Sequence, residues 1–208
     1  MTGARFITLE GGEGVGKSTQ LRALAEALRA RGLEVVETRE PGGSSGAEAV
    51  RDLLLTGAAD RWSPRAEALL FAAARADHVE KTIRPALQAG AWVLSDRFID
   101  SSRAYQGMGE LTDEDILTLH RIGSGGFLPD RTFVLTLPDA EAESRAHIRD
   151  GGESDRIGGR DSAFHQRVTQ AFSRFATKES DRIRAVDASG EAQTVTARLL
   201  QGLDDLLP

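Results

Sequence analysis

The 208-residue chain contains no cysteine. Disulfide frameworks, cysteine-based zinc sites and thiol nucleophiles are therefore excluded. No apolar run approaches the length that spans a membrane. The N-terminal MTGARFITLEGG passes from a short apolar stretch straight into glycines, without the long apolar core or cleavage site of a secretory signal. We expect a cytoplasmic protein with no membrane partner.

Positive charge is also in short supply. Lys and Arg number 26 against 32 Asp and Glu, which gives a net charge of -6. Nonspecific binding to nucleic acid or to anionic membranes needs a positive field. We therefore expect no nucleic-acid partner, and any anion site must be local.

Short apolar runs alternate with longer helical patterns, which favours βαβ units and a parallel sheet. We predict an α/β fold in one domain over residues 1–208, with a five-stranded parallel sheet flanked by helices in three layers. Because helices would cover both faces, the strands are expected to be buried on both sides. The expected strands are Arg5–Glu10, Glu34–Arg39, Ala91–Ser95, Thr132–Leu137 and Ile183–Asp187.

Three helices have recognisable signals. Leu21, Leu24 and Leu28 form an apolar stripe that predicts a helix over Lys17–Arg31. Ser63 before Pro64 is typical of an N-cap with proline in the first turn, and the helix is expected to run toward residue 88. Thr112 precedes three acidic residues, which favour the positive end of a helix dipole.

The segment 149–161, RDGGESDRIGGRD, is glycine-rich and charged and has almost nothing to bury. Such a segment is either a solvated loop or a short mobile lid, because moving parts come from the least stable regions. We interpret it as a lid.

The stretch after the first expected strand fits the pattern G-x-x-x-x-G-K-[ST], and a helix follows it. Its glycines let backbone N–H groups point at a polyphosphate, and the helix start adds its positive dipole end. The pattern predicts a P-loop NTPase fold in which Lys17 reaches the β and γ phosphates and Ser18 binds Mg²⁺. The predicted ATP-binding residues are Gly11, Gly12, Glu13, Gly14, Val15, Gly16, Lys17, Ser18 and Thr19.

A phosphate loop by itself leaves nucleotide kinases, GTP switches, ATP-driven motors and ATP-using ligases open. A GTP switch normally reads guanine with an Asn-Lys-x-Asp element, and this chain has no asparagine. Motors usually exceed this size or carry additional modules. A small kinase is the leading interpretation.

A second group of residues predicts an acceptor site. Asp96 ends an expected buried strand, from which a carboxylate can orient Mg²⁺, and the guanidinium of Arg97 suits a phosphate. Phe71 and Arg75 lie four positions apart on one helix, so the ring can stack on a base while the guanidinium donates to it. Taken alone, Phe71 is more typical of a core residue, and an Asp-Arg pair at a strand end can be a simple surface pair.

Five blocks carry a resemblance: LEGGEGVGKSTQ, TREPGGS, LLFAAARADHVE, DRFIDSSRAYQG and GGFLPD. In this order and at these distances the chain resembles the bacterial thymidylate kinases, which are P-loop nucleoside monophosphate kinases, over nearly its whole length. The resemblance implies transfer of the γ-phosphoryl group of ATP to dTMP, giving ADP and dTDP for dTTP synthesis, with Mg²⁺. It also implies a homodimer formed through helices away from the site.

The resemblance implies a role for each matching residue. Phe71 stacks on thymine and Arg75 donates to its carbonyl, while the segment from Ser101 to Gln106 lines the base edge and the sugar. Arg51 and Arg97 clamp the monophosphate. The implied dTMP-binding residues are Glu13, Glu40, Arg51, Phe71, Arg75, Arg97, Ser101, Ser102, Tyr105 and Gln106.

Gly14 stands where one branch of the family carries an arginine, so the resemblance implies a catalytic arginine from the lid. The candidates are Arg149, Arg156 and Arg160, of which the first two are preferred. The predicted catalytic residues are Lys17, Asp96, Arg97, Arg149 and Arg156, and the predicted metal ligands are Ser18 and Asp96. Two alternatives stay open: a kinase for AMP, CMP or dUMP, and a nucleotide-binding regulator that performs no transfer.

Overall fold

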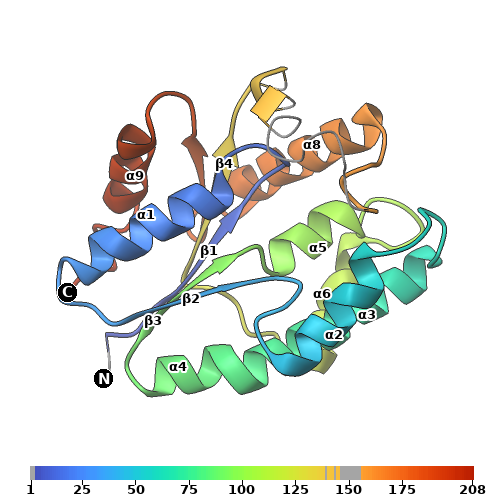
Figure 1. Cartoon of the computed structure of the whole chain (residues 1–208), viewed down its shortest axis with the longest axis horizontal. Coiled ribbons are helices and arrows are strands. Elements are labelled where there is room, and N and C mark those ends of the chain that lie inside the picture. The colour runs from blue at the N-terminus through green and yellow to red at the C-terminus, as the bar shows by residue number, and fades with distance from the viewer. Residues whose placement is uncertain (1–2, 139, 143, 146–155) are drawn as a thin grey trace.

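The computed structural model describes residues 3–138, 140–142, 144–145 and 156–208. These residues contain one all-parallel sheet with the strand order β2-β3-β1-β4-β5 (Figure 1). The predicted α/β fold is confirmed, and each strand lies within one residue of its expected bounds. The strands are β1 (Phe6–Glu10), β2 (Val35–Arg39), β3 (Trp92–Asp96), β4 (Arg131–Thr136) and β5 (Ile183–Asp187).

Helices cover the sheet on both faces, which gives three layers (Figure 1). One face carries α1 (Lys17–Arg29) and α9 (Ala192–Gln201), which pack against each other. The opposite face carries most of the other described helices. The other described helices are α2 (Ser45–Leu55), α3 (Pro64–His78), η1 (Val79–Ile83), α4 (Arg84–Gln88), α5 (Ile99–Tyr105), α6 (Asp113–Ser124) and α8 (Ser162–Lys178).

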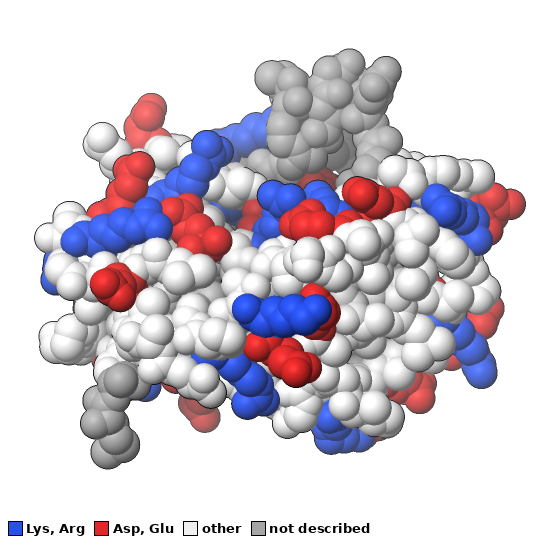
Figure 2. All heavy atoms as spheres, turned by 60° about the horizontal axis from the view of Figure 1, so that its bottom comes forward, with Lys and Arg blue, Asp and Glu red and all other residues white. Residues whose placement is uncertain are grey.

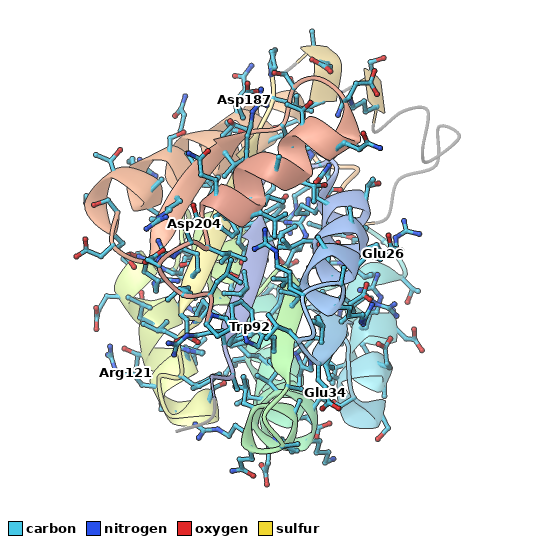
Figure 3. All side chains as sticks on the ribbon, turned by 90° about the vertical axis from the view of Figure 1, so that its left-hand side faces the viewer. Glu26, Glu34, Trp92, Arg121, Asp187 and Asp204 are labelled. Carbon is cyan, nitrogen blue, oxygen red and sulfur yellow. The ribbon has the colours of Figure 1, made fainter. Side chains whose placement is uncertain are left out.

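The core is divided by the sheet. Beneath α1, Leu24 and Leu28 are fully buried and belong to one apolar cluster with Trp92. Figure 3 shows Trp92 inside the molecule and Glu26 and Glu34 toward the outside. Each fully buried leucine contributes about 1.5–3 kcal/mol relative to an exposed one, so the amphipathic stripe holds α1 in place.

The expectation that every strand is buried on both faces is wrong at the edges of the sheet. All residues of β1 are buried, and those of β3 and β4 are buried except the last residue of each. In contrast, β2 contains no fully buried residue, and in β5 only Ile183 and Val186 are buried. An edge strand has a neighbour on one side only, so solvent reaches it.

The predicted helix starts at Ser63 and Thr112 are confirmed. The Ser63 hydroxyl accepts from the N–H of Ala66, and Thr112 forms a reciprocal capping box with Asp115. The expected single helix from Pro64 toward residue 88 is interrupted by the π-helical turn η1. The first helix ends at Arg29, two residues earlier than predicted, because the chain reverses at Gly32 with a φ of +84°.

Charges of both signs occur on the face drawn in Figure 2, where basic and acidic side chains are interspersed among uncharged ones. Among the helices of the described residues, none is both long enough and apolar enough to cross a membrane.

Candidate active site

The carboxyl ends of β1, β2 and β3 lie side by side at one edge of the sheet. In the parallel register, Asp96 at the end of β3 is opposite both Leu9 and Arg39. The loops that follow these three strands therefore begin next to one another. A cavity of about 390 Å³ opens among these loops and the neighbouring helices. Ligand sites of open α/β sheets are found at this position.

The loop between β1 and α1 depends on glycine at two positions. Gly11 has a φ of +131°, and a Cβ there would lie 2.6 Å from the carbonyl oxygen of Leu135. Gly16 has a φ of +90° and is the N-cap of α1, with no side chain to cap the helix. The first N–H groups of a helix have no intrahelical partner and so can bind an anion.

Lys17 is buried and folds back over this loop. Its Nζ donates to the carbonyl oxygens of Gly12 at 2.6 Å and Gly11 at 3.3 Å. Burial, followed by the nearby positive charge of Arg97, lowers the pKa of Lys17 to about 8. A bound polyphosphate would place a negatively charged partner beside the ammonium group of Lys17.

Ser18 and Asp96, the two residues predicted to bind the metal, contact each other. The Ser18 hydroxyl donates to Oδ2 of Asp96 at 2.6 Å, so a hydroxyl and a carboxylate oxygen share one spot beside the loop. Mg²⁺ in nucleotide sites is bound by one or two protein oxygens together with substrate phosphates. No group of three acidic, histidine or cysteine side chains in the described ranges could hold a metal without such help. The residues therefore fit Mg²⁺ delivered with a nucleotide.

Arg97 follows Asp96 in a left-handed backbone conformation, with a φ of +71°. Such strain in a residue other than glycine is typical of functional sites. Its Nη2 lies 2.5 Å from the Glu13 carboxylate, and its Nη1 donates to Gly11 O and Ser101 Oγ. Burial alone would lower the pKa of Arg97, but Tyr105 and the nearby carboxylates raise it above its ordinary value.

Glu10 is a buried residue of this region that sequence reasoning missed. Its carboxylate accepts from the N–H of Phe98 at 2.8 Å and from the hydroxyl of Ser101 at 2.5 Å. Burial and then the negative charge of Asp100 raise the pKa of Glu10 to about 8. Glu10 therefore fixes the turn that carries Arg97. The only available signal was an acid at the end of an otherwise apolar strand.

A buried charged network lies on the other side of the cavity. Nε of Arg75 donates to Glu40 at 2.8 Å, and Nη2 donates to the Ser102 hydroxyl at 2.8 Å. Nδ1 of His78 lies 3.0 Å from the second Glu40 oxygen, and its Nε2 lies 2.7 Å from the Thr38 hydroxyl. The prediction did not include His78, which supports Glu40 from behind.

Apolar and polar groups both line this part of the cavity. Phe71 is half-buried and lines the cavity, so its ring is accessible to a ligand and is not a closed core position. The Tyr105 ring stacks under the Arg97 guanidinium at 5.0 Å, and Arg51 donates to the Pro41 carbonyl at 2.7 Å.

The structure brings most of the predicted residues together. All ten residues predicted for dTMP line the cavity, as do Asp96 and the loop residues Gly14, Gly16, Lys17, Ser18 and Thr19. Gly11, Gly12 and Val15 lie outside its lining. Residues that line the cavity but were not predicted are Arg39, Pro41, Leu55, Phe98 and Ile157.

The arginines of the predicted lid are placed differently. Arg149 lies outside the described residues, as does the rest of 149–155. The Arg156 side chain is fully buried, and its Nε donates to the Leu54 carbonyl at 2.7 Å. Nη2 of Arg156 lies 2.7 Å from Glu67, and Nη2 of Arg160 lies 2.8 Å from the same carboxylate oxygen. Neither arginine is part of the cavity lining.

The fold and this site define a P-loop phosphotransferase whose cavity extends beyond the phosphate loop to Phe71, Arg75 and Gln106. We call the part lined by these three residues the base compartment. Comparison with known proteins narrows the class. The family model "Thymidylate kinase" matches residues 9–199. The chain belongs to the thymidylate kinase family.

Individual relatives agree with this assignment. The chain is 65% identical to the thymidylate kinase of Rhizorhabdus wittichii over 98% of its own length and 99% of the relative's. It is 50% identical to the thymidylate kinase of Caulobacter vibrioides over 96% of its own length and 95% of the relative's. The crystal structure of thymidylate kinase from Ehrlichia chaffeensis superposes with a TM-score of 0.75 at 33% identity, covering 96% of this chain and 98% of that one. The predicted family, the enzyme class and the phosphorylation of dTMP are thereby confirmed.

Proposed function

We propose that the chain transfers the γ-phosphoryl group of ATP to dTMP at the cavity between the phosphate loop and α3, with Mg²⁺ held at Ser18 and Asp96. One observation carries the proposal. One cavity is lined by Gly16–Thr19 of the phosphate loop, by Phe71 and Arg75 of α3, and by Asp96 and Arg97 at and after the end of β3. Arg97 contacts both Gly11 of the phosphate loop and Ser101 of α5, so it is placed where the phosphates of two nucleotides bound in this cavity would meet.

The proposed mechanism is in-line transfer by positioning and charge neutralisation, because phosphoryl transfer demands little acid or base chemistry of the protein. Lys17 binds the phosphates of ATP, and Arg97 and Arg51 bind the phosphate of dTMP. Ser18 and Asp96 would hold Mg²⁺, which when bound would neutralise part of the charge on the phosphates. Glu13 holds Arg97 in place, and Glu40 holds Arg75 of the base side, through the contacts described above.

On the base side, we propose that Phe71 stacks on thymine and that Arg75 donates to its carbonyl. Ser101, Ser102 and Gln106 complete the edge of that compartment, and Tyr105 lies close to the sugar. The half-buried ring of Phe71 and the buried guanidinium of Arg75 support this assignment, because an aromatic face and a fixed donor suit a pyrimidine.

We propose that one arginine of the lid, Arg149 or Arg156, binds the transferring phosphate. Arg156 can reach a phosphate only if it breaks its ion pair with Glu67 and its bond to the Leu54 carbonyl. We therefore favour Arg149 as the lid arginine at the transfer site. Measuring kcat for Arg149→Ala and Arg156→Ala separately decides between them, because only the arginine that binds the transferring phosphate lowers kcat without lowering stability.

The decisive experiment supplies ATP and Mg²⁺ with dTMP, dUMP, CMP and AMP in separate reactions and measures each diphosphate product. We expect dTDP as the main product, with some conversion of dUMP, since one methyl group is worth roughly 1–3 kcal/mol. Lys17→Ala and Arg97→Ala should each reduce turnover by about a hundredfold to a thousandfold. A regulator that binds nucleotide without transfer would give no diphosphate from any acceptor.

We also propose that the protein is a cytoplasmic homodimer. Leu69 on α3 and Ile122 on α6 are 55% and 79% exposed, and the two helices are neighbours. A paired surface containing these residues would explain their exposure. Sedimentation of the wild type and of Ile122→Glu tests this: the wild type should sediment as a dimer and the variant as a monomer.

A further inference from the structure

The carboxylate of Glu67 lies directly behind the base compartment. Glu67 is on α3, one helical turn before Phe71, and is only 3% exposed. It is not part of the cavity lining, whereas its partner Gln106 is. Nε2 of Gln106 donates to Oε1 of Glu67 at 3.0 Å. Glu67 therefore contacts a residue that faces the ligand without facing it itself.

The contacts of Glu67 fix which end of the Gln106 amide points at the ligand. Arg160 donates to both oxygens of the Glu67 carboxylate and Arg156 forms an ion pair with it, so these oxygens act as hydrogen-bond acceptors. Gln106 must turn its NH₂ group toward Glu67. Within the described residues the Gln106 carbonyl oxygen has no hydrogen-bond donor, and it is the end left for the cavity.

Arg75 presents the opposite polarity to the same compartment. Its Nε and Nη2 are used by Glu40, Phe98 and Ser102, and Arg75 lines the cavity. The remaining Nη1 can only donate. A ligand edge therefore meets a donor from Arg75 and an acceptor from Gln106.

We propose that Glu67 is a positioning residue that sets base specificity, by holding the Gln106 amide with its oxygen toward the cavity so that the bound pyrimidine must carry an N–H at N3. This inference rests on the proposed function. Thymine and uracil offer an N3–H donor next to a carbonyl acceptor and match the pair. Cytosine offers an unprotonated N3 next to an amino group and is mismatched at both positions.

The substitution Glu67→Gln tests the orientation directly. Arg156 and Arg160 then compete for the one remaining oxygen, so the new amide turns its NH₂ toward Gln106. Gln106 responds by turning its own oxygen back and its NH₂ into the cavity. A site that forms a hydrogen bond with a substrate N–H discriminates strongly against analogues that lack this N–H. Discrimination on the basis of one methyl group is much weaker. We expect the dTMP to dCMP ratio of kcat/KM to fall roughly ten- to hundredfold, mainly through the KM for dTMP.

The ratio of dTMP to dUMP is an internal control. Both bases carry N3–H, so Glu67→Gln should leave their ratio within about twofold of the wild type. Arg160→Gln is the matched control variant, because it removes one ion pair from Glu67 and leaves the bond to Gln106 in place. Its dTMP to dCMP ratio should equal that of the wild type.

The exchange variant Glu67→Gln with Gln106→Glu supplies a rescue. The NH₂ of the residue at 67 then donates to the carboxylate at 106, whose second oxygen faces the cavity, and discrimination against dCMP should return. A folded Glu67→Gln protein with the wild-type ratio would overturn the inference, as would an exchange variant that accepts dCMP as readily as Glu67→Gln does.

If neither Glu67→Gln nor the exchange variant folds, the test is NMR of wild-type protein with bound dTMP. We expect the N3 imino proton of thymine to be protected from exchange with water, because the Gln106 oxygen accepts from it. An unprotected imino proton overturns the inference. If wild-type protein fails to phosphorylate dTMP, the proposed function fails; if it phosphorylates dTMP but the variants leave the base ratios unmoved, only the role of Glu67 fails.

Discussion

The hydroxyl of Ser18 lies 2.6 Å from the carboxylate of Asp96, although the two residues are 78 positions apart in the chain. Ser18 is in the first turn of α1 and Asp96 is the last residue of β3. The parallel pairing of β1 with β3 brings these two ends together. Both oxygens are ligands that Mg²⁺ prefers.

Asp96→Asn should separate metal binding from folding. The amide oxygen still accepts from Ser18, so the fold is kept, but the negative charge that attracts Mg²⁺ is lost. We expect kcat to fall about a hundredfold or more, and the Mg²⁺ concentration for half-maximal rate to rise. Asp204→Asn makes the same chemical change at an exposed position, labelled in Figure 3, and should leave both quantities unchanged. A normal Mg²⁺ dependence in Asp96→Asn would contradict the assignment.

Arg75→Lys should impair the acceptor site selectively. A lysine cannot reproduce the fork that binds Glu40 and Ser102 while leaving a third donor for the base. We expect the KM for dTMP to rise at least about tenfold and the KM for ATP to stay within about twofold. Steady-state kinetics with each substrate varied in turn measures the difference. An equal rise in both KM values would place Arg75 outside the base compartment.

Gly43→Ala should destabilise the protein more than Gly32→Ala. Both glycines have a φ of +84°. A Cβ at Gly43 would lie 2.4 Å from both His78 Nε2 and Thr38 Oγ1, whereas at Gly32 nothing lies within 4 Å. We expect the unfolding free energy to fall by about 1 kcal/mol in Gly32→Ala, from backbone strain alone, and by about 3 kcal/mol in Gly43→Ala. Urea unfolding with both variants gives the comparison, and equal losses would be the contrary result.

His120 should make the protein sensitive to acid. Burial, and then the charge of Arg75, lowers the pKa of His120 from its ordinary 6.5 to about 4. Between these pH values the unfolded chain binds a proton that the folded chain does not, so stability falls as the pH drops from 6.5 to 4.

His120→Gln removes this titration while its amide can still donate to the Phe127 carbonyl. The unfolding free energy of the variant should depend less steeply on pH in this window, by up to about 1.4 kcal/mol per pH unit. Above pH 8 the difference in unfolding free energy between the wild type and His120→Gln should not change with pH. If the unfolding free energies of the wild type and of His120→Gln changed equally with pH between pH 4 and 7, His120 would not titrate as described.

Much of the site could be predicted because its parts are local. The glycines and Lys17 of the phosphate loop, the acid at the end of β3, and the spacing of Phe71 and Arg75 on α3 all lie within short segments with their own geometry. The partners of these residues were harder to predict. His78 and Glu67 carry no local signature, and the only signal for Glu10 is an acid at the end of an apolar strand. An acid or a histidine in such segments is equally compatible with the surface.

The amino-acid sequence by itself determined the order of strands and helices, the phosphate loop and the family, because hydrophobic periodicity and glycine patterns act over a few neighbouring residues. Only the tertiary structure decided which charges are paired. It placed Arg156 and Arg160 on Glu67 and His78 behind Glu40, because ion pairs form between side chains from distant segments once the sheet and its helices have packed.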